Sequence, residues 1–93
     1  MKPIRFAARI RFWNPDKDSG LAVCDLPAEH VAALGGLKQQ RVHGFIGGAE
    51  FTSNVMPAGG GTLALSVSKA MMSSGQVGVG DRADVEIHAV GQS

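Results

Sequence analysis

The most regular hydrophobic pattern in the chain is an alternation that runs from Ile4 to Trp13. Apolar side chains at even positions alternate with a set that contains three arginines at odd positions. A period of two is typical of a strand with one buried face, so we predict a strand here whose Ile4 side points inward. The segment 14–20 is dense in turn-forming residues and ends this strand.

Shorter apolar or alternating runs predict five further strands, each bounded by glycine-rich turns. Gly47 and Gly48 form a two-residue signal for a hairpin between two of these strands. The segment 57–61, with one proline and three glycines, is predicted as a loop. The predicted strands cover residues 21–26, 41–46, 49–55, 62–67 and 83–90.

Two short helices are predicted between the strands. One spans Pro27–Leu34, with a proline in its first turn and the pair 35–36, both glycines, as its stop. The other runs from Lys69 to Ser74, and Ser68 is placed to cap its first turn.

The order of strand, helix, glycine-rich turn and strand occurs twice, in segments 22–46 and 63–87, at an offset of about 41 residues. The repeat predicts a barrel of two similar halves related by a pseudo-two-fold axis. The predicted class is therefore mainly β (α+β), with about six short strands and two short helices. Closure also protects the edges that a small open sheet would expose.

Length, charge and cysteine content limit the number of domains, the class of ligand and the cellular compartment that we expect. A chain of 93 residues fits one domain covering residues 1–93, and a dimer would help so short a chain to bury more surface. The net charge of +1 lacks the basic excess typical of proteins that grip phosphates. A single cysteine, Cys24, fits a reducing compartment, and no apolar run approaches the roughly 20 residues that span a bilayer. We expect a cytoplasmic protein that does not enter the membrane.

The clearest candidate site is the outward side of the first strand, which carries Arg5, Arg9, Arg11 and Trp13. Arginines bind phosphates and tryptophan stacks on bases, so this face suits single-stranded nucleic acid or a small anion. The alternative is a solvated face whose arginines keep the strand soluble.

Other chemical groups give weaker signals. The glycine loops at 59–61 and 78–80 match neither the phosphate-loop nor the dinucleotide pattern, and we expect Asp81 to bond backbone N–H groups in its own turn. Cys24 lies in an apolar strand and is predicted to be inert. No metal site and no cofactor is predicted, because the cysteine and the histidines lack paired ligand spacing, although two histidines could meet across paired strands. The histidines are His30, His43 and His88, and the two that could meet are His43 and His88. Methionines 56, 71 and 72 fill the core or line a pliable groove.

Three segments carry a family resemblance. Residues 41–53 (RVHGFIGGAEFTS) resemble a central hairpin, the pair of segments 57–61 and 65–69 (PAGGG and LSVSK) resembles the stretch that follows it, and residues 79–85 (VGDRADV) resemble a closing element. In this order they resemble the bacterial domain of unknown function DUF1905 over residues 5–87. The resemblance implies a double-split β-barrel, and it carries no catalytic or ligand-binding residue.

Together these observations favour a non-enzymatic binding or structural module. In one hypothesis the barrel forms a homodimer or binds a protein partner or small ligand. In the other it binds nucleic acid through the arginine and tryptophan face of the first strand. Because fold does not fix function, the sequence leaves both open.

Overall fold

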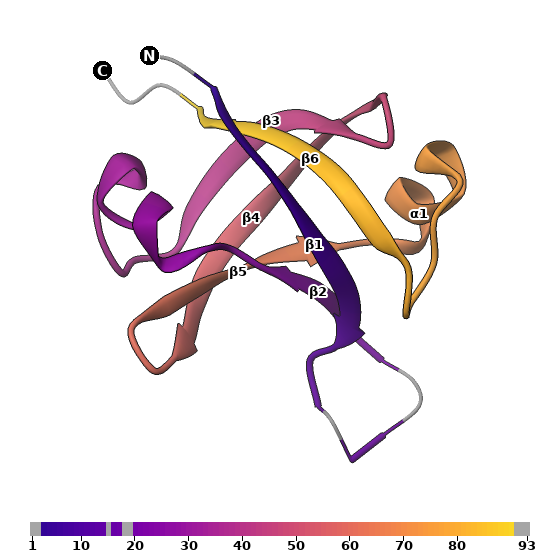
Figure 1. Ribbon diagram of the computed structural model, residues 1–93, viewed down its shortest axis with the longest axis horizontal. Helices are drawn as coiled ribbons and strands as arrows, with labels where there is room; N and C mark the ends of the chain where they lie inside the picture. Colours follow the sequence, from indigo (N-terminus) through magenta and orange to yellow (C-terminus); the bar gives the residue numbers. More distant parts are fainter. Residues whose placement is uncertain (1–2, 15, 18–19, 91–93) are drawn as a thin grey trace.

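The protein is a closed barrel of six antiparallel strands (Figure 1). The computed structural model describes residues 3–14, 16–17 and 20–90. Around the barrel the strands follow the order β1-β2-β5-β4-β3-β6. In chain order they are β1 (Ile4–Phe12), β2 (Ala22–Asp25), β3 (Gln40–Ile46), β4 (Ala49–Gly59), β5 (Thr62–Val67) and β6 (Arg82–Ala89).

The two longest strands each divide their pairing between two neighbours. Residues 4–9 of β1 pair with β6, and residues 10–12 pair with β2. Residues 49–55 of β4 pair with β3, and the strand then pairs with β5 from Val55 onward. This is the double-split arrangement that the family resemblance implies.

The pairing register confirms the repeat seen in the sequence. Cys24 of β2 pairs with Leu65 of β5, and Phe45 of β3 pairs with Glu86 of β6. The members of each pair are 41 positions apart, so each residue faces its own equivalent, as residues beside a two-fold axis must. The long strands β1 and β4 also correspond, because β1 lies between β2 and β6, and β4 lies between their equivalents β5 and β3.

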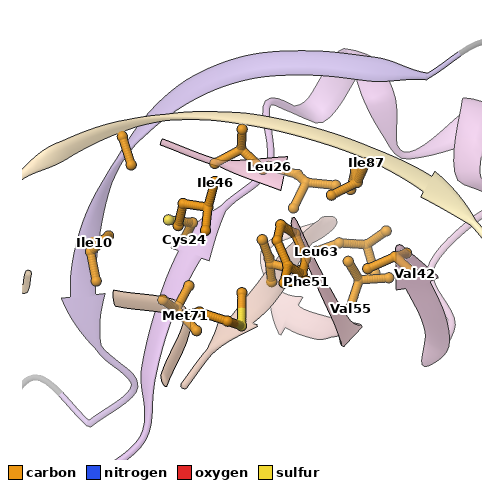
Figure 2. Packing of buried hydrophobic residues seen from close by; sticks show 14 of the residues in the cluster. Ile10, Cys24, Leu26, Val42, Ile46, Phe51, Val55, Leu63, Met71 and Ile87 are labelled. Carbon is orange, nitrogen blue, oxygen red and sulfur yellow. The ribbon is translucent and has the colours of Figure 1, made fainter. Parts of the chain in front are cut away.

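A single apolar cluster fills the barrel. Figure 2 shows labelled side chains from every strand and from the short helix α1 (Lys69–Gly75) pointing toward one another. No polar or charged residue in the described part of the chain is buried. A barrel this small is filled by its own side chains, which leaves the outer surface as the place for a ligand.

Strand β4 differs from its prediction. The predicted loop at 57–61 was wrong in its first half, because β4 continues through Pro57 to Gly59 and only Gly60 and Gly61 turn the chain. The pairing register with β5 shifts between Pro57 and Gly59. A strand tolerates the missing N–H of proline at such a bulge, and this explains why the proline does not end β4.

The helices lie on opposite sides of the barrel, α1 to the right in Figure 1 and two 3-10 turns to the left. Ser68 caps α1 by accepting a hydrogen bond from the Met71 N–H at 3.1 Å, as predicted. The predicted helix at Pro27–Leu34 is divided into the turns Ala28–His30 and Ala32–Leu34, because so short a segment without a side-chain cap does not sustain an α-helix. None of the described helices has the length and apolar character needed to cross a membrane.

Glycines at the hairpin that joins β3 and β4 allow a tight turn and a close backbone contact with α1. Gly47 and Gly48 form its turn, and both have positive φ (56° and 85°), as a tight two-residue hairpin requires. A Cβ atom at Gly47 would overlap the carbonyl of Gly75 at the end of α1, whereas one at Gly48 would meet open space. The turn therefore also fixes the position of α1.

We predict that Gly48→Val lowers the free energy of unfolding by more than about 1 kcal/mol, because a β-branched residue is strained at positive φ. Gly47→Val should cost about 3 kcal/mol or more, since its side chain also meets the backbone of α1. Urea denaturation of both variants measures the two costs. Equal costs would contradict the contact between the hairpin and α1, and an unchanged Gly48→Val would contradict the turn conformation.

Candidate binding site

A cleft of about 580 Å³ opens on the outer face of the barrel where β3, β6 and β1 lie side by side. One row across these strands positions three of its side chains, those of Arg5, Phe45 and Glu86. Phe45 lies opposite Glu86 in the β3–β6 pair, and Glu86 lies opposite Arg5 in the β1–β6 pair. The residues that line the cleft are Arg5, Phe6, Phe45, Gly48, Asp84, Val85 and Glu86.

Alternation along the strands explains why these side chains point outward. In β6 the neighbours Ala83, Val85 and Ile87 are buried, which leaves Asp84 and Glu86 on the outer side. In β3 the residues on either side of Phe45 are buried, and the Phe45 side chain is 40% exposed. Gly48 lines the cleft without a side chain, and a Cβ atom added there would meet open space.

An ion pair crosses the cleft wall. The Nε atom of Arg5 donates a hydrogen bond to Oε1 of Glu86 at 2.8 Å. The Arg5 side chain is 77% exposed, and an ion pair this exposed contributes at most about 1 kcal/mol to folding. A ligand can therefore displace it at small cost.

Histidines form the next row on the same outer face. His43 of β3 and His88 of β6 are paired residues with ring centroids 5.3 Å apart, so the two histidines do meet across strands. The Nε2 atom of His43 lies 2.7 Å from Oε2 of Glu50 on β4. Within the described ranges, no group of three or more histidine, cysteine or carboxylate side chains is arranged to hold a metal ion.

The arginine face predicted from the sequence is largely engaged in internal contacts. Arg11 binds Asp25 with two hydrogen bonds, from Nε at 2.7 Å and from Nη2 at 2.9 Å. The hydrogen bond that Arg11 donates to Asp25, opposed by desolvation, raises the pKa of Arg11 above its usual value. Arg9 donates to the carbonyl of Gly80 at 2.5 Å, and the Trp13 side chain is 38% exposed. The structure brings only Arg5 of these four residues into the cleft.

A second hollow, an apolar groove of about 460 Å³, lies between α1 and the ends of β1 and β2. Met72 lines it, as one of the two sequence hypotheses for the methionines proposed, whereas Met71 is buried in the core. The full lining consists of Phe12, Gly20, Leu21, Ala22, Val67, Ser68, Lys69, Met72 and Val79.

The turn at residues 78–81, before β6, contains the hydrogen bond to Asp81 that the sequence predicts. The backbone N–H of Gly78 donates to Oδ2 of Asp81 at 2.9 Å, so Asp81 stabilises its own turn as predicted. In the other glycine loop the Thr62 hydroxyl donates to the carbonyl of Gly59 at 2.9 Å. Both contacts are those of ordinary turns.

In a comparison with known families, residues 6–87 match the family described as domain of unknown function (DUF1905). The chain belongs to the DUF1905 family. A search of curated proteins finds no similar sequence. The description of the DUF1905 family names no ligand or reaction.

Sequence reasoning missed Phe45, Asp84 and Glu86 as candidate site residues. Each lies at an outward position of a strand with alternating burial, and this alternation was the sequence pattern from which its exposure could have been predicted. What the sequence does not show is that β6 lies between β1 and β3, and only this neighbour order gathers the residues beside Arg5.

The cysteine of this DUF1905 chain is removed from any surface chemistry. Cys24 is fully buried, and burial, with a smaller contribution from Asp25, raises the pKa of its thiol to about 11. The thiol therefore stays protonated near neutral pH, where a nucleophile needs the thiolate.

We predict that Cys24 resists a maleimide reagent in the folded protein at pH 8 and reacts fully in urea. The raised pKa also makes stability depend on pH, because the thiol of the unfolded chain ionises near 9.0 and the folded one near 11. The free energy of unfolding should fall as the pH rises between these values. The chain has no tyrosine to titrate in the same range.

Cys24→Ala is the control for the pH effect, because it removes the thiol and should flatten this part of the profile. Fast labelling of the folded protein, or identical pH profiles for the two proteins, would contradict the assignment of Cys24 to the closed core.

Proposed function

We propose that this DUF1905 chain is a non-enzymatic interaction module that binds a partner protein or a small ligand at the cleft formed by β3, β6 and β1. The observation that carries the proposal is the cleft itself, in which an exposed aromatic ring stands beside two carboxylates and a guanidinium. Its volume lies in the range of roughly 300–1,000 Å³ typical of ligand sites.

Two further observations support a role in binding. The interior is filled with apolar side chains, so a ligand has to bind outside the barrel. The one thiol of the chain is buried and protonated, which removes it as a nucleophile. A buried free cysteine also fits our proposal that the protein works in a bacterial cytoplasm, where thiols stay reduced.

Nucleic-acid binding remains the second candidate, and one pairing favours it. Arg9 lies directly opposite Arg82 in the β1–β6 pair, and like charges placed opposite each other are destabilising unless an anion joins them. Against it, Arg5 and Arg11 are bound to carboxylates. The NMR experiment described next distinguishes the two candidate functions.

We predict that small fragments added to isotope-labelled protein shift the NMR signals of amides around the cleft, those of residues 5–6, 45–48 and 84–86. The panel should contain cationic, anionic and neutral aromatic fragments, with Phe45→Ala as the variant that removes the aromatic wall. Binding is expected to weaken in this variant, because Phe45 is the exposed large apolar side chain of the lining.

A single-stranded oligonucleotide forms the other arm of this experiment. Shifts confined to residues around Arg9 and Arg82, together with an affinity that falls steeply with salt, would favour the nucleic-acid candidate. Fragment shifts that gather in the apolar groove, or nowhere, would contradict the cleft as the binding site.

A further inference from the structure

The cleft carries a local excess of negative charge, although the whole chain has a net charge of +1. Asp84 and Glu86 line it, and Glu50 stands opposite Phe45 on β4, at the end of the same row. These are three of the eight acidic residues of the chain, and Arg5 is the one basic residue in the lining. Arg9 and Arg82 lie further along β1 and β6, outside the lining residues.

The exposed ring of Phe45, like the negative charge of the cleft, favours a positively charged ligand. Phe45 has a glutamate as its pairing partner on each neighbouring strand, Glu50 on β4 and Glu86 on β6. A cation over the face of an exposed ring is attracted by the ring quadrupole, with a strength of about 0.5–1 kcal/mol. Carboxylates beside the ring add direct electrostatic attraction, so the two features reinforce each other.

We propose that the cleft binds the side chain of an arginine or lysine presented by a partner protein, with its aliphatic part on Phe45 and its charge between Asp84 and Glu86. This inference rests on the proposed function, and it names the class of partner. Charge complementarity argues for it, since the incoming cation meets a surface with more carboxylates than bases. In the free protein the exposed guanidinium of Arg5 forms an ion pair with Glu86, and the bound arginine or lysine would replace it.

A partner protein fits the site better than a small organic cation. The cleft has a volume of about 580 Å³, and a Cβ atom added at Gly48 in its lining would meet nothing within 4 Å, so there is room beside this turn for residues next to the bound arginine or lysine. Val85 contributes to the floor, and its neighbours on β6 supply the charges. A short peptide therefore makes contacts that free arginine cannot.

The test is an NMR titration of labelled protein with a blocked five-residue peptide that contains two arginines among alanines. The matched probes are the same peptide with glutamate in place of arginine, and free argininamide. We expect the arginine peptide to shift amides of residues 45–48 and 84–86, the glutamate peptide to bind at least about tenfold more weakly, and argininamide to bind more weakly than the arginine peptide.

Variants separate the contribution of charge from that of the ring. Asp84→Asn and Phe45→Ala should each weaken binding of the arginine peptide by about fivefold or more. Asp16→Asn removes the same charge from the turn region between β1 and β2, and Leu37→Ala removes an exposed apolar side chain outside the cleft; both should leave affinity within about twofold. Phe45→Trp should strengthen binding, because tryptophan is the best cation–π partner.

Equal binding of the arginine and glutamate peptides would overturn the inference, and so would equal effects of Asp84→Asn and Asp16→Asn. Binding of argininamide as tight as that of the peptide would overturn the assignment to a protein partner. If fragments bind at the cleft but the arginine peptide does not, the proposed function stands and this inference fails. If neither binds there, both fail.

Discussion

The close approach of β3 to β6 is the constraint on which the rest of the structure depends. Gly44 lies in the middle of β3, and a Cβ atom at this position would overlap the backbone oxygen of Glu86. Only glycine lets the two strands come this near. This contact joins the first half of the chain to the last strand and closes the barrel, with Phe45 and Glu86 paired beside it.

Closure determines where function can reside. The inward side of each strand is committed to one apolar cluster, and α1 is fixed to the β3–β4 hairpin through Gly47 and Gly75. Chemistry is therefore left to the outward positions, and the junction of β3 and β6 collects an aromatic ring, carboxylates and paired histidines there. The interaction that holds the barrel closed thus also creates the surface that we propose as the binding site.

Much of the fold could be predicted from the sequence because its signals are local. Alternation from Ile4 onward gave the first strand and its inward face, and Ser68 marked the start of α1. The repeat offset of 41 residues agrees with the register that pairs Cys24 with Leu65. Pro57 was misleading, because a bulge in β4 tolerates the missing donor.

The candidate site was much less predictable, because it depends on contacts between distant parts of the chain. The outward arginines of β1 were recognised, but their partners are far along the chain: Glu86 for Arg5 and the carbonyl of Gly80 for Arg9. Phe45 and Asp84 are ordinary outward residues until the strand order places them around one cleft. A single sequence does not give this order.

The measurement that tests the closed barrel most directly is the free energy of unfolding of Gly44→Ala compared with Gly78→Ala. The added methyl group at position 78 has room, since its nearest neighbour would be a carboxylate oxygen of Asp81 at 3.9 Å. We expect Gly44→Ala to lower the free energy of unfolding by about 3 kcal/mol or more, or to prevent folding, and Gly78→Ala to change it by less than about 1 kcal/mol. Equal, small effects would mean that β3 and β6 do not approach closely, and this would contradict both the closed barrel and the cleft built on it.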